Sequence, residues 1–337
     1  MNERARILVT GGAGYIGSHA CKALAEAGFL PVTYDSLEAG HAWAVRWGPL
    51  EEGDIADGAR LGAVMDRYRP AALMHFAAHI AAGESVADPG KYYRNNVAGS
   101  LCLLETMRAH GLARLVFSSS AAVYGTPEAT PIPETHPTRP INPYGASKLM
   151  IERMIGDFSA AHGLRAVSLR YFNAAGADAS GGIGEAHEPE THAIPLALTT
   201  ALGARTNFEI HGTDYATPDG TAIRDYVHVS DLAAAHVGAL DRLLAGGEGA
   251  VVNVGAGGGF SVRQVLAAAE AAAGRKIPVR EGPRRPGDPA VLVADAAEAR
   301  RLLDWRPRHT EIADIVASAW AWHAGRHSGS GEAASGI

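Results

Sequence analysis

A tyrosine and a lysine four residues apart, Tyr144 and Lys148, could carry out acid–base chemistry. Asn142 is a good helix N-cap and Pro143 suits the first helical position, so the sequence predicts Tyr144 in the first turn of a helix. Side chains at positions i and i+4 share one helix face. The ammonium, together with a positive nicotinamide nearby, would stabilise the phenolate and lower the pKa of the tyrosine from about 10 toward neutrality. The pair predicts a base that accepts a hydroxyl proton, although this spacing is also common by chance.

Three serines, Ser118, Ser119 and Ser120, follow a short apolar run at residues 115–117. In open α/β sheets, ligands bind at the ends of such strands. We predict that Ser120 bridges a substrate oxygen and Tyr144. Ser118 is expected only to cap or line a turn.

A glycine-rich turn precedes the first predicted helix, where residues 10–17 read TGGAGYIG. Gly11 permits a tight turn, Gly14 lets the backbone approach a pyrophosphate, and Gly17 lets the helix pack close to a sheet. The phosphates would meet free N–H groups at the helix N-terminus. A glycine cluster alone is a weak signal, but the strand before it and the helix after it favour a dinucleotide site.

An acidic residue, Asp35, stands eighteen positions beyond Gly17, at the end of the second predicted strand. Its carboxylate could accept the ribose hydroxyls and would repel an additional phosphate, which favours NAD over NADP. A surface aspartate in a turn is the alternative. Asp54 is a plausible adenine contact or, alternatively, a helix cap.

Strand-like and helix-like segments alternate over the first 170 or so residues. The predicted strands are 7–9, 31–34, 73–76, 115–117 and 166–169, and the predicted helices are 15–28, 59–68, 92–110 and 144–162. This alternation predicts a parallel sheet covered by helices with right-handed crossovers, an α/β fold of the Rossmann type with a doubly wound sheet.

The pattern changes after residue 173, where glycine and proline become frequent. Shorter segments at 194–202, 208–211, 231–244, 251–254 and 262–273 predict a smaller mixed α/β domain that binds the substrate. We assign residues 1–173, plus returning segments near 226–255, to the NAD-binding domain and 174–327 mainly to the substrate domain. Residues 328–337, rich in glycine, serine and alanine, are predicted to be a disordered tail.

Composition narrows the class of protein. A net charge of −6 over 337 residues gives no reason to expect a nucleic acid or an anionic membrane as partner. The two cysteines, Cys21 and Cys102, exclude a disulfide framework and fit the reducing cytoplasm. We predict no targeting signal, no membrane anchor and no metal site. The longest apolar run, 71–82, contains two histidines and is too short to span a bilayer.

Four further motifs point to a known protein family. Residues 75–78 read HFAA, 83–86 read GESV, 169–173 read LRYFN and 219–229 read DGTAIRDYVHV. Together with the glycine spacing, the serines and the Tyr–Lys pair, they resemble the UDP-glucose 4-epimerase family within the extended short-chain dehydrogenase/reductase superfamily. The resemblance covers about residues 6–325 and involves several specific motifs in the same order.

The resemblance implies a role for residues at matching positions. It places Phe76, Lys148 and Tyr171 along the NAD, and Asn173 at the diphosphate or sugar of the substrate. The UDP phosphates would be held by two arginines, whose planar guanidinium groups bind phosphate oxygens in pairs, and the uridine ribose by an aspartate. These three residues are Arg224, Arg285 and Asp288. Without the resemblance, either arginine could equally form a surface ion pair.

The predicted sites are therefore three overlapping sets. The catalytic residues are Ser120, Tyr144 and Lys148. The cofactor contacts are Gly11, Gly14, Tyr15, Ile16, Gly17, Asp35, Asp54, Ile55, Phe76, Ala77, Asn95, Tyr144, Lys148 and Tyr171. The substrate contacts are Ser120, Tyr144, Asn173, His192, Arg224, Arg285, Asp288 and Leu292.

Two positions depart from some members of the family. Ile80 stands where they carry a lysine near the nicotinamide, which removes a positive charge and could shift the pH optimum. His192 stands where they carry an asparagine, which leaves the hydrogen bonds on the uracil side open. The position that limits sugar size matches Leu292, which is neither as large as tyrosine nor as small as serine.

The reaction that this resemblance implies is a 4-epimerisation of UDP-glucose and UDP-galactose. Tyr144 would take the proton of the 4-hydroxyl while hydride passes from carbon 4 to NAD, giving a transient 4-keto sugar and bound NADH. After the sugar turns over, hydride would return to its opposite face. Since NAD is regenerated in each turnover, it can stay bound.

Other functions stay open. A dehydratase or decarboxylase of this superfamily needs an acidic residue beside the serine, where residues 121–122 are both alanine. A 4-epimerase of UDP-arabinose/UDP-xylose or of UDP-N-acetylhexosamines would use the same machinery. A non-catalytic dinucleotide-binding regulator could dispense with Tyr144 and Lys148. The resemblance also implies a homodimer packed through helices 92–110 and 144–162 as a four-helix bundle.

Overall fold

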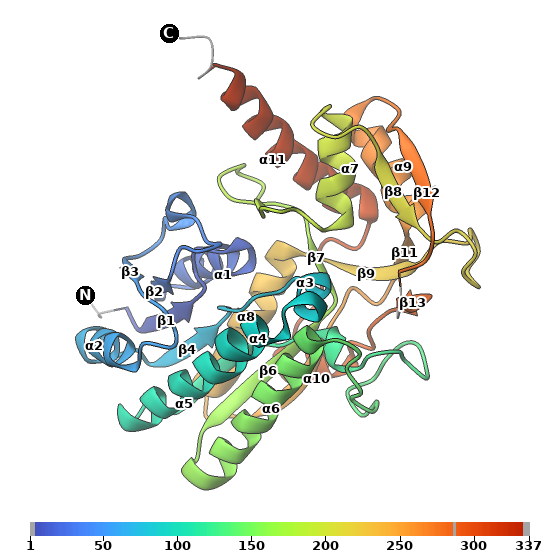
Figure 1. The fold of residues 1–337 in the computed structure, drawn as a ribbon. Helices are drawn as coiled ribbons and strands as arrows, with labels where there is room; N and C mark the ends of the chain where they lie inside the picture. Colours follow the sequence, from blue (N-terminus) through green and yellow to red (C-terminus); the bar gives the residue numbers. More distant parts are fainter. Residues whose placement is uncertain (1–3, 286–287, 333–337) are drawn as a thin grey trace.

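A seven-stranded parallel sheet forms the centre of the molecule (Figure 1). The structure is a computed structural model that describes residues 4–285 and 288–332. The strand order is β10-β6-β5-β4-β1-β2-β3. In sequence order the strands are β1 (Arg6–Thr10), β2 (Leu30–Asp35), β3 (Leu50–Glu52), β4 (Ala72–His75), β5 (Arg114–Ser118), β6 (Arg165–Tyr171) and β10 (Ala250–Val254). The predicted doubly wound α/β fold is confirmed.

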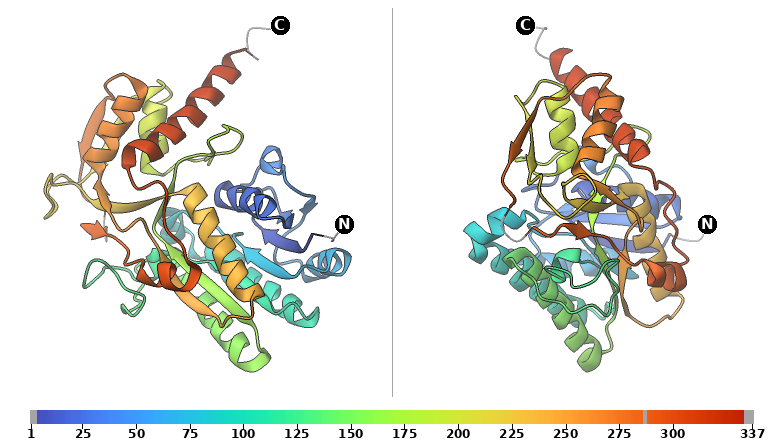
Figure 2. Two further views of the ribbon diagram at one scale, coloured as in Figure 1. Left: turned by 180° about the vertical axis from the view of Figure 1, so that it is seen from behind. Right: turned by 90° about the vertical axis from the view of Figure 1, so that its right-hand side faces the viewer.

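Helices cover both faces of this sheet, as the view from behind shows (Figure 2). One face carries α1 (Tyr15–Glu26), α8 (Val229–Leu244) and α10 (Ala297–Leu303), and the other carries α2 (Gly58–Tyr68), α5 (Gly99–Ala109) and α6 (Pro143–His162). In β1, Ile7 and Val9 join the first apolar cluster, whereas Leu8 joins the second. Because alternate side chains point to opposite faces, a strand covered on both sides reads as a continuous apolar run.

The segment predicted as a single helix over 92–110 is divided in the structure. Two short helices, α3 (Ala82–Ala87) and α4 (Pro89–Tyr92), lead into it. The segment then runs as the π-helix η2 (Tyr93–Ala98) and continues as α5. Within η2, the buried amide of Asn96 bonds the backbone N–H and C=O of His79 and the hydroxyl of Ser147. The helix itself is confirmed, but its wide turn was not predicted, because apolar periodicity does not reveal such a turn, a feature that often marks a functional site.

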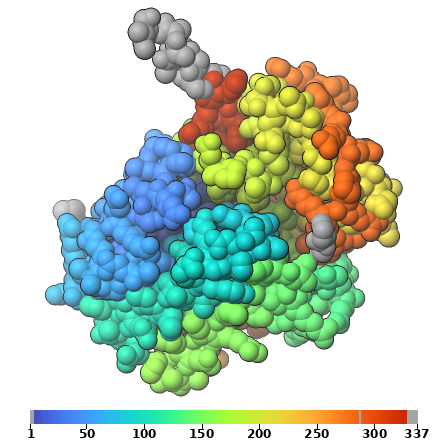
Figure 3. All heavy atoms as spheres, viewed as in Figure 1, coloured from blue at the N-terminus to red at the C-terminus, as the bar shows by residue number. Residues whose placement is uncertain are grey.

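A smaller mixed unit packs beside the sheet, drawn in yellow and orange in Figure 3. Its strands are β7 (Asn173–Ala175), β8 (Phe208–His211), β9 (Ile223–His228), β11 (Gly259–Ser261), β12 (Val279–Gly282) and β13 (Val291–Leu292). Its helices are α7 (Ala193–Ala201), α9 (Val262–Ala273) and α11 (Ile312–Glu332). They pack together around one apolar cluster. Short 3₁₀ turns, η1 (Ala42–Ala44) and η3 (Ala121–Val123), lie in loops at the edge of the main sheet.

The chain crosses between the two units more than once. After β9 of the small sheet, α8 and β10 return to the large sheet, so the returning segment is 229–254. Helix α11 continues to Glu332, so the tail predicted to be disordered from residue 328 begins as helix, and residues 333–337 lie outside the described part. Extending an existing helix by one residue costs little once its first turns are packed. Within the described ranges, no helix combines the length and apolarity needed to cross a membrane.

Two glycines in helices allow a test of the close packing at the first turn. A Cβ on Gly17 would lie 2.1 Å from the backbone oxygen of Gly11, whereas a Cβ on Gly156 in α6 would meet nothing within 4 Å. We expect Gly17→Ala to lower the free energy of unfolding by about 1–3 kcal/mol through overpacking. Gly156→Ala should raise it by up to about 1 kcal/mol, because alanine favours the helix. Urea denaturation of both variants provides the measurement, and a Gly17→Ala protein as stable as the parent would contradict this packing.

Candidate active site

The predicted functional residues gather at one edge of the large sheet. In the parallel register, Thr10 pairs with Tyr34 on one side and with His75 on the other. Strand β5 ends in step with β4, since His75 pairs with Phe117, and β6 runs on to Tyr171 beside it. The loops that follow these strands therefore meet at the carboxyl edge, where open α/β sheets bind ligands.

The glycine turn has the shape of a phosphate cradle. Gly11 has a φ of +74°, and a Cβ there would lie 2.5 Å from the backbone nitrogen of Ala77. Gly14 is the N-cap of α1 and no side chain caps that helix. The first N–H groups of α1 are thus left for an anion, as a dinucleotide site requires.

The side chains next to the turn have structural partners. The hydroxyl of Tyr15 donates to the backbone oxygen of Gly176 at 2.6 Å, and Ile16 packs against the apolar core. The N–H groups of Phe76 and Ala77 both donate to the backbone oxygen of Thr10. These contacts hold the turn between two strands and bind it to the loop after β7.

Asp35 lies beside the glycine turn. Its buried carboxylate accepts the N–H groups of Ala13 at 3.0 Å and Leu37 at 2.9 Å. Burial raises the pKa of this carboxyl, while the two N–H bonds oppose the increase. Asp35 is therefore held in place by the turn itself and is not a surface aspartate in a turn.

The outer predicted cofactor residues are arranged around β3 and η2. The carboxylate of Asp54 accepts the N–H of Ala56 at 2.8 Å, so it closes a turn, while Asp57 is the N-cap of α2. Ile55 is buried, and a Cβ on Gly99 would lie 2.8 Å from its side chain. The side-chain amide of Asn95 donates to that of Asn96 at 2.9 Å.

Lys148 is buried behind the reacting edge. Its ammonium donates to the backbone oxygen of Ser118 at 2.8 Å and lies 6.0 Å from the centre of the Tyr144 ring. Burial lowers the pKa of Lys148 to about 7, against the opposing charge of Glu152. A lysine that titrates near neutrality can change its charge during a reaction.

The phenol of Tyr144 lies next to the side chain of Ser120. Burial raises the pKa of Tyr144 above its ordinary value, and the Ser120 hydrogen bond opposes the increase. The expected lowering involves the positive nicotinamide as well as Lys148, and the protein's own groups alone do not produce it. The cost of burying a phenolate exceeds the stabilisation from a lysine that points toward the Ser118 carbonyl.

Ser118 has a larger part in the site than the sequence indicated. Its backbone oxygen accepts from Lys148, and its hydroxyl bonds the hydroxyl of Tyr171. Ser120 also caps a turn, because its hydroxyl accepts the N–H of Ala122 at 3.1 Å. Ser120 thus caps a turn, as had been expected only of Ser118, while Ser118 contacts two predicted cofactor residues.

A buried ion pair behind the site was not predicted. Arg170 donates to both carboxylate oxygens of Glu152 at 2.9 and 2.6 Å, and the hydroxyl of Ser119 donates to the same carboxylate at 2.6 Å. The other side of Arg170 donates to the hydroxyl of Tyr124 at 3.0 Å. The sequence signal was Glu152 itself, which stands one further helical turn beyond Lys148.

Most of the predicted substrate residues lie on the smaller unit, and we call these the substrate row. Asn173 pairs with Tyr226 across β7 and β9, and Arg224 pairs with Leu292 across β9 and β13. The guanidinium of Arg224 forms an ion pair with Asp288. The alternative of an ion pair is thus realised for Arg224. Arg285, one turn away from Asp288, is exposed.

Asn173 also lines a small pocket together with His192 and Tyr226. His192 is the N-cap residue of α7, and its Nδ1 lies 2.7 Å from Glu185 Oε1 and 3.2 Å from Glu190 Oε1. Burial would lower the pKa of His192, but these carboxylates outweigh it and raise the pKa to about 10. The structure thus brings an imidazole that contacts two carboxylates to the wall of this pocket.

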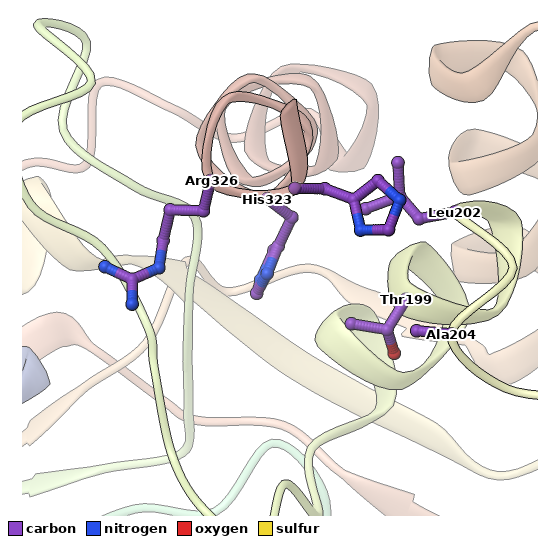
Figure 4. Close-up of a pocket in the computed structure, with 6 residues that line it drawn as sticks. Thr199, Leu202, Ala204, His323 and Arg326 are labelled. Atoms are coloured by element: carbon purple, nitrogen blue, oxygen red, sulfur yellow. The ribbon is translucent and has the colours of Figure 1, made fainter. Parts of the chain in front are cut away.

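A larger hollow lies elsewhere, between α7 and α11 (Figure 4). It has a volume of about 480 Å³, and its lining includes Thr199, Leu202, His323 and Arg326. None of the predicted catalytic, cofactor or substrate residues belongs to this hollow. It is therefore not the site of the predicted chemistry.

Comparison with known proteins adds independent findings. Residues 7–255 match the model of the NAD dependent epimerase/dehydratase family. A UDP-glucose 4-epimerase of Rhizobium meliloti is 53% identical over 323 residues, which cover 96% of this chain and 98% of that protein.

Solved structures agree with these relatives. A UDP-glucose 4-epimerase from Brucella ovis in complex with NAD has a TM-score of 0.92 and 49% identity, covering 94% of this chain and 98% of that one. A UDP-glucose-4-epimerase from Stenotrophomonas maltophila with bound NAD and formylated UDP-arabinopyranose has a TM-score of 0.94 and 40% identity, covering 97% and 100% of the two chains.

The pKa of Lys148 makes stability depend on pH in a defined direction. Between its folded value of about 7 and an unfolded value of about 10.4, the unfolded chain binds more protons, so stability rises with pH. We expect the unfolding free energy of the parent, relative to Lys148→Met, to increase by about 1.4 kcal/mol per pH unit in this window. Urea denaturation at pH 7 and about pH 9 measures the difference.

Lys91 provides the control for this experiment. It forms an ion pair with Glu84 that raises its pKa, so it stays charged in both states over the same window. Lys91→Met should therefore follow the parent in parallel. If Lys148→Met also runs parallel to the parent, Lys148 keeps its charge when buried and the assignment fails.

Proposed function

This chain belongs to the NAD dependent epimerase/dehydratase family, and from this premise we propose that it inverts carbon 4 of a UDP-hexose, interconverting UDP-glucose and UDP-galactose. Its cofactor is NAD. One observation supports the proposal most directly: Tyr144, Ser120 and Lys148 converge at the same sheet edge as the glycine turn.

The residues around the glycine turn fit NAD. The uncapped N-terminus of α1 offers N–H groups to the pyrophosphate, and Asp35 is held where the second strand ends, in position for the ribose hydroxyls. Phe76 and Tyr171 both lie against the ring of His236, and this aromatic group would line the nicotinamide side. When bound, NAD supplies the group that accepts hydride from carbon 4 and returns it.

Tyr144 is the base that we assign to the reaction. Its phenol would take the proton of the 4-hydroxyl, and Ser120 would bridge the two oxygens. Burial favours the neutral phenol of Tyr144. A positive charge close to the ring must therefore stabilise the phenolate before Tyr144 can act as a base. Lys148 can supply this charge, because its ammonium lies 6.0 Å from the centre of the ring and its pKa is about 7.

The substrate row on the smaller unit would bind the UDP part of the substrate. Arg224 is already oriented by Asp288, and Asn173 lines the adjoining pocket. An arginine fork suits a diphosphate, and Asp288 would then turn to the uridine ribose. Strong binding of UDP and weak binding of the sugar would let the sugar turn over between the two hydride transfers.

Three alternatives differ in their support. The sugar could be a pentose or an N-acetylhexosamine, because Leu292 lies beside the Ser120 loop and a relative was solved with a formylated UDP-arabinopyranose. A dehydratase is disfavoured, because the residue after Ser120 is Ala121. A non-catalytic regulator would have no use for the buried Lys148.

We also propose a homodimer in the cytoplasm. Leu101 on α5 and Met150 on α6 are large apolar residues with 39% and 42% of their surface exposed. A second copy packed on this face would cover them as a four-helix bundle. The free thiols of Cys21 and Cys102 fit a reducing compartment.

Replacing Tyr144 tests the proposed base. We expect Tyr144→Phe to lower turnover of UDP-galactose by about 10²- to 10⁴-fold, the usual contribution of a general base, while bound NAD is retained. Product analysis gives the rate, and absorbance of the released cofactor gives the NAD content. Tyr93→Phe, which changes an exposed phenol on η2, is the matched control.

Either of two results would contradict this proposal. A Tyr144→Phe enzyme close to the full rate would remove Tyr144 from its role. A parent protein that forms no epimer and shows no change in the NADH absorbance band with any UDP-sugar would favour the non-catalytic regulator.

Substrate size tests the assignment of Leu292. With a panel of UDP-sugars, we expect the parent to prefer UDP-glucose and UDP-galactose. Leu292→Ala should raise kcat/KM for UDP-N-acetylglucosamine relative to UDP-glucose by about 10-fold, because methylene groups in a pocket discriminate on that scale. Leu149→Ala, in the same apolar cluster but on α6, should leave the ratio unchanged. Equal ratios in all three proteins would show that Leu292 does not limit sugar size.

A further inference from the structure

Four potential metal ligands converge in the loop between β7 and α7. They are Glu185, His187, Glu190 and His192, and one ligand atom from each lies within 4.8 Å of those of the others. Among the residues that the structure describes, no other group of three or more histidine, cysteine or acidic side chains is this close. From the sequence we predicted no metal site. The spacing of these four residues in the loop does not match a known metal-binding motif.

The distances between these atoms are close to those of a small coordination cage. Nδ1 of His192 lies 2.7 Å from Glu185 Oε1 and 3.2 Å from Glu190 Oε1. Nδ1 of His187 lies 3.1 Å from Glu185 Oε1 and 4.0 Å from Glu190 Oε2. Tetrahedral zinc at about 2.0–2.2 Å from its ligands places them about 3.3–3.6 Å apart. Three of these distances are shorter than that range and one is longer, so small side-chain rotations would form the cage around an ion.

The surrounding chain orients the ligands. Glu185 is only 4% exposed, and its backbone oxygen accepts the indole N–H of Trp322 at 2.7 Å. Glu190 accepts the N–H groups of Thr191 at 2.7 Å and His192 at 2.8 Å on one carboxylate oxygen. Ring nitrogen Nε2 of His41 bonds the backbone oxygen of Ala186 at 2.8 Å. In metal sites, hydrogen bonds from neighbouring groups hold the ligating side chains in position.

A neighbouring histidine provides a separate observation. Nε2 of His323 on α11 is buried and has no hydrogen-bond partner. The charges of Glu185 and Glu190 act on this imidazole and on the phenol of Tyr15. Glu185 and Glu190, with the two histidines, thus place two carboxylates and two imidazoles beside a buried imidazole nitrogen that has no partner of its own.

We propose that Glu185, His187, Glu190 and His192 bind one zinc ion. Two imidazoles and two carboxylates favour zinc over magnesium or calcium, which prefer oxygen ligands alone. With four protein ligands the site is closed, so the metal is structural. It fixes the loop whose last residue, His192, lines the pocket with Asn173. This inference goes beyond the proposed function, because no step of the epimerisation uses the metal.

Zinc binding by the full chain tests the proposal without an activity assay. Protein stripped with a chelator is incubated with zinc chloride, freed of excess by gel filtration, and measured for metal by mass spectrometry. We expect one zinc per chain for the parent. His187→Gln and Glu190→Gln should each weaken binding at least about 10-fold, the smallest loss typical of changes around metal ligands. His110→Gln is the matched control, since that imidazole pairs with Asp66 on the surface between α2 and α5.

Two further readouts keep the result decisive if a variant folds poorly. Cobalt in the parent should give the intense visible absorption of a tetrahedral site, and anomalous scattering from zinc-soaked crystals should peak between Glu185 and His192. A parent that holds no more zinc than the His187→Gln and Glu190→Gln variants, a weak octahedral cobalt spectrum, or a zinc peak elsewhere would each overturn the proposal. The cluster would then consist of histidine–glutamate ion pairs alone. NAD content and circular dichroism report folding separately.

Discussion

The burial of one ammonium group constrains the whole catalytic side of the molecule. The buried ammonium of Lys148 donates a hydrogen bond to the Ser118 carbonyl instead of to water, and this burial lowers its pKa to about 7. A buried charge is costly, so the surrounding groups must be fixed in place. The start of α6 is held by the side chain of Asn142, which accepts the N–H of Gly145 at 2.8 Å. This cap sets the direction in which Tyr144 and Lys148 leave the helix.

Behind this lysine, a second buried charge pair supports the same helix. Glu152 accepts Arg170 through two hydrogen bonds, and Tyr124 connects Arg170 to Asn253 on β10. The negative charge of Glu152 favours the charged form of Lys148, against the effect of burial. The site therefore depends on a network that joins α6, β6 and β10, and each partner left alone would be a buried unpaired group.

Contacts between the two units keep the substrate row near the carboxyl edge of the large sheet. Tyr15 at the glycine turn bonds Gly176, and His41 after β2 bonds Ala186. Trp43 packs on Trp322 of α11 with ring centres 5.5 Å apart. All three contacts reach the loop between β7 and α7 or the helix that covers it. The same loop carries the Glu–His cluster, so its order bears on both the cofactor side and the substrate side.

Local rules explain what the sequence by itself determined. Apolar alternation, the glycine spacing and the Asn142–Pro143 start of α6 depend on neighbouring residues, so the strands, the dinucleotide turn and the Tyr144–Lys148 pair could all be predicted. Tertiary structure alone decided the rest. Arg224 and Asp288 are 64 positions apart, and Tyr124 and Asn253 are 129 apart. The raised pKa of Tyr144, the bond from Lys148 to Ser118, the wide turn around Asn96 and the convergence of Glu185 with His192 arise from burial and long-range packing, which no local pattern encodes.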